Sequence, residues 1–381
     1  PLRHALADLV PHHDRERLTA LAPDLVDRFA LLNGVVGSAY PETETTAPMV
    51  GPVRADNTVA LLAELLDRAR GERPLLFVLD DVHDLDSASW RLVRELETRN
   101  RLMVVLSGRG TDAAEPSEEW HEAAGRTDVR QIAIGPMTDA EMATLAARRL
   151  GVEDLPREVA AVVADKAQGN PFFVEEIAYA LRDAGHVVID DGVCRVGDAG
   201  WTDDLSLPDT IEGVVLGRLD ELPEAQRLLV RVASTVGRVF AVALLRDVHP
   251  VVEEQPNVER HLDALERQHI SQPEDGEPVI NHLFRHVITR DVAYDSLTYA
   301  QRRSLHLRIA EWYHERLGTD REVTAAVLAH HWARAGARRQ AVEWAVRAAQ
   351  EALENNANRE ALRFVEDADR ISIDPDLGRW D

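Results

Sequence analysis

The sequence predicts a protein of mixed class, α/β plus all-α, and three observations lead to this prediction. In the first third of the chain, two wholly apolar runs, Leu75–Leu79 and Leu102–Leu106, alternate with amphipathic helical stretches. Short apolar runs of this kind are typical of parallel strands that helices connect. After Gly135 and Pro136 the apolar spacing becomes almost entirely helical. A length of 381 residues, at roughly 150 residues per domain, predicts two to three domains.

Composition and charge restrict the class of protein and its partners. Hydrophobic residues make up 45% and charged residues 29%, as in ordinary globular proteins. A membrane-spanning helix needs about 20 consecutive apolar residues. The apolar runs of this sequence are much shorter, so we expect no membrane partner. The N-terminus lacks the apolar segment of a signal peptide, and the single cysteine, Cys194, excludes a disulfide framework; together they predict a cytoplasmic protein. The net charge of -24 argues against general binding to nucleic acid or anionic membranes.

The first predicted domain, residues 1–135, alternates helices and strands. Residues 40–57 hold three prolines and predict an exposed loop, after which an amphipathic helix ends at Gly71. The two apolar runs predict strands of a parallel sheet, the first of them buried on both faces. Residues 129–134 predict a third strand.

A second, helical domain is predicted over residues 136–205. Residues 138–141, Thr-Asp-Ala-Glu, form a capping box at the start of a helix. A later helix opens at Pro171, and residues 186–196 predict a small hairpin with an Asp-Gly pair at its turn.

Two further segments complete the expected organisation. Over residues 206–300, helices precede a strand–turn–strand unit between Ile270 and Leu283, which is compatible with a winged helix. Residues 301–381 are helical and Ala-rich, and a segment at 337–344 is echoed at 357–364, which suggests the start of a helical solenoid.

Polar side chains follow both predicted strands directly. Asp80 and Asp81 come after the first strand, and Ser107 and Arg109 follow the second. Parallel sheets place ligand sites at this edge, where one carboxylate can hold Mg²⁺, the next can activate water, and arginine can bind phosphate. The alternative interpretation is an acidic turn in which Asp86 and its neighbour cap the next helix, with a surface arginine.

A phosphate-binding loop of the Walker A type is missing from the chain. That loop needs a lysine after a glycine frame, and the only lysine, Lys166, has no such frame. Either the loop lies upstream of Pro1, or the chain does not bind nucleotide in the usual way.

Four segments resemble one known family. Residues 75–90, LLFVLDDVHDLDSASW, resemble the Walker B segment of the STAND class of signal-transduction ATPases, relatives of AAA proteins. Residues 168–177, QGNPFFVEEI, resemble the GxP motif of large LuxR-type regulators and of ATPase modules fused to adenylate or guanylate cyclases. Residues 284–315 and 329–353 are similar to later segments of the same proteins, in the family's order.

The resemblance implies a chain that begins after its Walker A motif. It implies a partial P-loop NTPase sheet over residues 1–135, a helical lid with the GxP motif over 136–205, a winged helix over 206–300 and the start of a TPR-like solenoid over 301–381. The implied cofactors are ATP or ADP and Mg²⁺.

The resemblance also implies roles for single residues in the sheet. Asp80 would be the Walker B acid associated with Mg²⁺, and Asp81 would be the catalytic acid that activates water. Arg109 would be the sensor arginine, with Ser107 beside it.

Three residues of the lid and winged helix are implied as nucleotide contacts. Gly169 and Pro171 form the GxP motif, in which Pro171 would contact the adenine. His286 would match the histidine that touches the phosphates of the resting ADP form. The family often has an acid next, whereas this chain has Val287.

The expected function is an ATP- and ADP-binding switch module of a multidomain bacterial-type signalling protein, either a transcriptional regulator or a nucleotide cyclase. Hydrolysis would reset the switch where an upstream P-loop is present, and we expect the chain by itself to be inactive as an ATPase. The TPR-like helices would bind a protein or small-molecule effector, and the nucleotide state would govern self-association.

Two other functions stay open. The first is a non-hydrolysing scaffold for protein interactions. The second is direct DNA contact through the winged helix, but residues 206–300 contain nine arginines and sixteen acids, a local charge of 9 - 16 = -7 that disfavours DNA.

Overall fold

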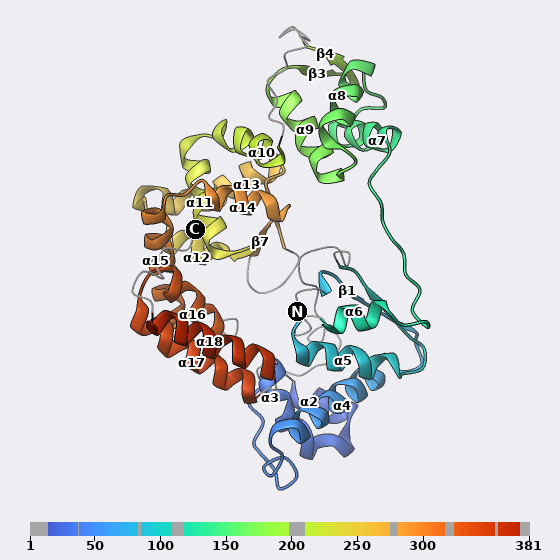
Figure 1. Cartoon of the computed structure of the whole chain (residues 1–381), viewed down its shortest axis with the longest axis vertical. Helices are drawn as coiled ribbons and strands as arrows, with labels where there is room; N and C mark the ends of the chain where they lie inside the picture. Colours follow the sequence, from blue (N-terminus) through green and yellow to red (C-terminus); the bar gives the residue numbers. More distant parts are fainter. Residues whose placement is uncertain are drawn as a thin grey trace. The chain divides into compact units, whose positions relative to one another are not determined.

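The computed structural model divides the chain into two compact units, residues 1–131 with 316–381, and residues 132–315 (Figure 1). The structure describes residues 14–36, 38–82, 85–108, 118–197, 210–274, 281–316, 324–354 and 357–373.

The first unit combines a two-stranded sheet with helices from both ends of the chain. Its N-terminal elements are α2 (Arg15–Leu21), η1 (Pro23–Leu32), α3 (Asn33–Val36), α4 (Gly51–Arg70), β1 (Leu75–Leu79), α5 (Ser87–Glu97), β2 (Leu102–Leu106) and α6 (Glu118–Ala124). Its C-terminal helices are α16 (Ala325–Arg334), α17 (Arg338–Glu354) and α18 (Asn358–Ile373).

The strands β1 and β2 are parallel, as predicted, with Leu75 opposite Leu102. One face of this sheet packs into a core with α4 and α5, where Phe77 is 4% exposed. The prediction that β1 is buried on both faces is wrong. On the other face Leu76 is 58% exposed and Met103 64%, since nothing among the described residues of this unit covers that face.

Two more predictions for the first domain are corrected. Residues 129–134 form no strand, and Ile134 is 95% exposed, because no described strand lies beside this segment to pair with it. The exposed loop predicted for 40–57 ends earlier than expected, since α4 already begins at Gly51. Proline fits within the first turn of this helix because the N–H that it lacks would have no partner there.

The C-terminal helices of the first unit pack in sequence, α16 on α17 and α17 on α18. They also contact the N-terminal part of the same unit. Glu360 of α18 accepts hydrogen bonds from the backbone N–H and the hydroxyl of Ser87, at 3.1 and 2.9 Å. Arg359 pairs with Glu119 of α6 through both terminal nitrogens, at 3.0 and 2.9 Å.

The second unit begins with three helices and a hairpin. The capping box is confirmed, because the Thr138 hydroxyl accepts from the backbone of Glu141 while the Glu141 carboxylate accepts from the backbone of Thr138. The predicted hairpin is also confirmed, and Asp191 and Gly192 at its turn have φ of 47° and 76°, as a type I′ turn requires. The elements are α7 (Asp139–Leu150), α8 (Arg157–Ala167), α9 (Pro171–Asp183), β3 (Val187–Asp190) and β4 (Val193–Val196).

The rest of the second unit surrounds a small antiparallel sheet of order β5-β7-β6. The two arms predicted between Ile270 and Leu283 are present as β6 (Ser271–Pro273) and β7 (Asn281–Phe284). The predicted turn covers residues 274–278, and all of it except Glu274 lies outside the described residues, as do 279 and 280 of the predicted second arm. The elements are α10 (Ile211–Asp220), α11 (Glu224–Val236), β5 (Val239–Ala241), α12 (Val242–Val248), η3 (Val252–Asn257), α13 (Val258–Arg267), β6 (Ser271–Pro273), β7 (Asn281–Phe284), α14 (Val287–Asp295) and α15 (Tyr299–Arg316), whose last residue belongs to the first unit.

The fold is therefore mixed and helix-rich, with small sheets, as the predicted class requires. None of the helices in the described part of the chain has the combination of length and apolar character needed to cross a bilayer.

A buried ion pair joins α9 to α10 in the second unit. The Arg218 guanidinium donates a short hydrogen bond to the Glu176 carboxylate, and the two side chains are 7% and 3% exposed. Arg218 also donates to the carbonyl of Gln268 at 2.9 Å and lies over the Tyr179 ring, 5.0 Å from its centroid. Because a buried charge without its partner is costly, this pair fixes how α9 and α10 pack.

We expect Arg218→Met to lower the free energy of opening of α9 and α10 by about 3–5 kcal/mol, since it leaves Glu176 buried and unpaired. Native-state hydrogen exchange of the α9 and α10 amides measures this. Arg195→Met is the matched control, because Arg195 and Asp190 are each 65% exposed and such pairs contribute about 0–1 kcal/mol. Equal effects of the two substitutions would contradict the role given to Arg218.

Candidate functional site

The carboxyl ends of β1 and β2 bring Asp80 and Ser107 together in the first unit. The ladder continues past the strands, because the Ser107 N–H donates to the Leu79 carbonyl at 2.9 Å and the Val82 N–H donates to the Ser107 carbonyl at 3.0 Å. The Ser107 hydroxyl donates a short hydrogen bond to the Asp80 carboxylate. Two of the predicted site residues are thus neighbours, as parallel pairing requires.

Asp81 follows in an unusual backbone conformation. Its φ is 53°, in the left-handed region that aspartate tolerates better than most residues, and its N–H donates to the Asp80 carboxylate at 3.1 Å. Both carboxylates are exposed. Oxygen ligands at an exposed position suit a hard cation such as Mg²⁺, which retains several waters when bound.

Helix α5 begins just after these acids, and another residue caps it. The Asp86 carboxylate accepts from the Ser89 N–H at 2.7 Å, so this part of the alternative interpretation is correct. Asp80 and Asp81 are not needed for the cap. Arg109, the predicted sensor, lies outside the described residues.

The second group of predicted residues lies in the second unit, at the start of α9. Gly169 is buried with φ of 83°, and a Cβ there would lie 2.5 Å from Cβ of Pro136. Its carbonyl accepts from the Met137 N–H at 2.9 Å. The structure therefore gives Gly169 a packing role, and a contact with a ligand stays a prediction.

Pro171 is exposed in the first turn of α9. The preceding Asn170 caps the helix, since its side-chain oxygen accepts from the N–H groups of Phe172 and Phe173 at 3.0 and 3.3 Å. The cap stabilises the start of α9 at Pro171, and thereby the positions of Pro171 and Phe172 in its first turn.

His286 lies directly before α14, and its ring contacts the start of α9. The centroids of the Phe172 and His286 rings are 4.1 Å apart, with the ring planes tilted by 51°. The structure thus brings His286 against Phe172, the residue that follows Pro171 in the sequence.

A buried carboxylate joins this place to α7. One oxygen of Glu175 lies 2.7 Å from a terminal nitrogen of Arg149, and the other lies 3.5 Å from Nε2 of His286. The Glu175 side chain is 7% exposed. Burial acts to raise the pKa of the Glu175 carboxyl, but the pairing with His286 and Arg149 outweighs it and lowers that pKa below its usual value.

Four arginines act on the same stretch of α9, and two of them, Arg149 and Arg218, are paired with Glu175 and Glu176. The ring of Tyr179, one turn after Glu175, stacks on His269 with centroids 4.9 Å apart. Burial lowers the pKa of His269, and four arginines lower it further. These are Arg285, Arg182, Arg218 and Arg149. Among the described residues, Nε of Arg285 is buried without a hydrogen-bond partner.

Arg149, Phe172 and Glu175 were not predicted as site residues. A signal for Glu175 was present, because two adjacent acids, Glu175 and Glu176, stand within an otherwise apolar helical face. Acids at positions that a helix must bury need cationic partners, but the sequence does not say which arginines supply them.

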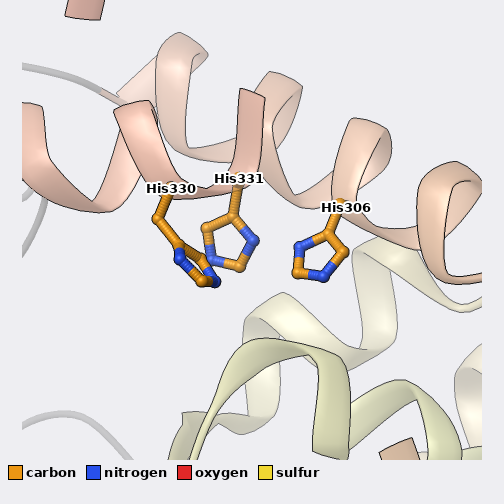
Figure 2. A group of neighbouring side chains, drawn as sticks. All are labelled: His306, His330 and His331. Atoms are coloured by element: carbon orange, nitrogen blue, oxygen red, sulfur yellow. The ribbon is translucent and has the colours of Figure 1, made fainter. Parts of the chain in front are cut away.

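Figure 2 shows three histidines, His306 of α15 and His330 and His331 of α16. In α16, burial lowers the pKa of His331 to about 3, with a smaller contribution from His330, whose ring lies 5.2 Å away edge-on. In α15, Nε2 of His306 lies 3.0 Å from the Tyr294 hydroxyl.

Comparisons with known proteins give distant relatives. Residues 138–195 match a family described as a domain of unknown function, DUF8739. The chain is 25% identical over 358 residues to the uncharacterized protein R02095 of Rhizobium meliloti, covering 91% of this chain and 32% of that protein. It is 21% identical over 282 residues to adenylate cyclase type 10 of Mus musculus, covering 62% of this chain and 17% of the cyclase. The chain thus spans a third or less of the length of these relatives.

We expect Gly169→Ala to destabilise the second unit by about 2–4 kcal/mol, because it adds a steric overlap with residue 136 to a left-handed backbone. Gly151→Ala is the matched control: Gly151 has φ of 73°, and its added Cβ would meet nothing within 4 Å. It should cost about 1–2 kcal/mol. Hydrogen exchange of the α7 to α9 amides measures both, and equal losses would rule out the close approach as the reason for glycine at 169.

Proposed function

We propose that this chain is the ATP- and ADP-binding switch module of a larger bacterial-type signalling protein. One observation supports this most directly: the ring of Phe172, the residue after Pro171, contacts the His286 ring, with centroids 4.1 Å apart. In this proposal the exposed Pro171 ring packs on adenine and His286 pairs with the phosphates. The module corresponds to a helical lid with a GxP motif, followed by a winged helix.

The first unit contributes the metal and water chemistry in this proposal. The hydrogen bond of Ser107 to Asp80, beside the exposed Asp81, supports a Walker B edge of a partial P-loop sheet. Asp80 would hold Mg²⁺, which when bound neutralises phosphate charge. Asp81 would orient and deprotonate water, and Arg109 would sense the terminal phosphate.

The whole protein's output is part of the proposal. The similarity to adenylate cyclase type 10 over 62% of this chain is compatible with an ATPase-like module beside a nucleotide cyclase. A transcriptional regulator fits the same residues. In both cases hydrolysis needs a phosphate-binding loop that these 381 residues lack, so the chain by itself would not hydrolyse ATP. We place the parent protein in the cytoplasm.

The helices α16 to α18 would form the start of a TPR-like solenoid that binds the effector. Apolar side chains of α17 and α18 are exposed, among them Leu353 at 54% and Leu362 at 59%.

This exposure of apolar side chains on α17 and α18 also favours a second candidate function, a scaffold that binds a protein partner and no nucleotide. In that case the purified parent protein would bind its partner with the same affinity whether or not ATP or ADP is present.

We expect Asp81→Asn, in the full-length parent protein, to lower the rate of ATP hydrolysis by about 100-fold or more, since it removes the general base. ATP binding should persist, because the Mg²⁺-associated Asp80 stays. Steady-state phosphate release and nucleotide titration measure the two quantities.

The matched control for this experiment is Glu72→Gln, which removes an exposed carboxylate just before β1. Its turnover should equal that of the wild type. An unchanged rate of ATP hydrolysis in Asp81→Asn would contradict the role assigned to Asp81.

A further inference from the structure

We infer that the Glu175 carboxylate is an internal anion that occupies Arg149 and His286, and that a phosphate group of the ligand must displace it to reach His286. The inference rests on the proposed function of the same site. It adds a regulatory step, the exchange of one anion for another, to nucleotide binding.

The first support is that His286 Nε2 is buried and that the Glu175 carboxylate faces it. The buried Nε2 atom has no hydrogen-bond partner among the described residues, and the Glu175 oxygen facing it lies 3.5 Å away. An anion from solvent can meet Nε2 only if the side chains around it move, and the facing Glu175 carboxylate would repel that anion unless it moved as well. The distance is longer than a normal hydrogen bond, so an oxygen at about 2.8 Å from Nε2 would pair better with the imidazole.

The second support is that the two partners of Glu175 differ in exposure. The Arg149 side chain is 40% exposed, whereas Glu175 is 7% exposed and His286 25%. Arg149 can therefore leave Glu175 and meet an incoming phosphate at the surface, and a guanidinium binds phosphate through two parallel hydrogen bonds.

The third support is the field at the start of α14. His286 is the residue before this helix, no side chain caps it, and α14 has nine residues. The first N–H groups of a helix favour a negative charge there. Arg285 adds to this field, because its charge acts on the pKa values of both Tyr179 and His269. A carboxylate and a phosphate would compete for the same positive region.

The test is the affinity of the full-length parent protein for ADP and for inorganic pyrophosphate, measured by calorimetry. Glu175→Gln keeps the size of the side chain and removes its charge. We expect it to bind both ligands roughly tenfold more tightly, within the 5–150-fold range typical of coupling between ligands. Glu158→Gln on α8 is the control, because it removes an exposed negative charge from the same unit; it should bind as the wild type does.

A second variant keeps the test decisive if Glu175→Gln does not fold. Glu175→Asp shortens the side chain, so its carboxylate meets Arg149 and His286 less well, and ADP should bind more tightly than to the wild type. In Arg149→Met, ADP should bind more weakly, and adding Glu175→Gln to it should recover part of the loss.

The outcomes separate the inference from the proposed function. If the wild type binds ADP and Glu175→Gln binds it equally or more weakly, the exchange is overturned and Glu175 instead positions His286. If the wild type binds neither ADP nor pyrophosphate, the nucleotide site and the exchange fail together.

Discussion

Two adjacent buried acids on α9 constrain the whole of the second unit. Counted over the whole residue, Glu175 and Glu176 are 5% and 2% exposed. An isolated carboxylate at such a position would be very costly in free energy. Each is therefore paired with cations from other elements, Glu175 with α7 and the start of α14, and Glu176 with α10. These pairs join four helices and include His286, whose ring also contacts Phe172, so helix packing and the proposed ligand contacts share residues.

The first unit is governed by a different constraint, the pairing of two parallel strands. Parallel pairing aligns the ends of β1 and β2, and this alone brings Ser107 to Asp80. Parallel sheets normally have a layer on each face, yet Leu76, Val78 and Met103 are exposed on one side. A phosphate-binding loop with its own strand and helix would supply such a layer, which makes the exposed face compatible with the proposed NTPase sheet.

Much of the local structure follows from short sequence signals. The capping box at Thr138 and the Asp191-Gly192 turn depend only on neighbouring residues, and both are confirmed. Strand burial could not be predicted in the same way, because an apolar run shows that a side chain can be buried and not whether another layer is present. For residues 129–134 the apolar pattern was present, but no described neighbour strand completes the pairing.

The sequence offers candidate site residues where a motif stands in one stretch, as for Asp80, Asp81 and Pro171, and their ligand roles stay predictions. The pairing of Glu175 with Arg149 and His286 depends on three separate elements, so only the fold reveals it.

The most direct test of the nucleotide switch is the nucleotide content of the purified full-length parent protein, denatured and chromatographed. The switch predicts close to one ADP per chain. No bound nucleotide, together with no binding of added Mg-ATP, would contradict it and leave Asp80 and Asp81 as ordinary residues of an acidic turn.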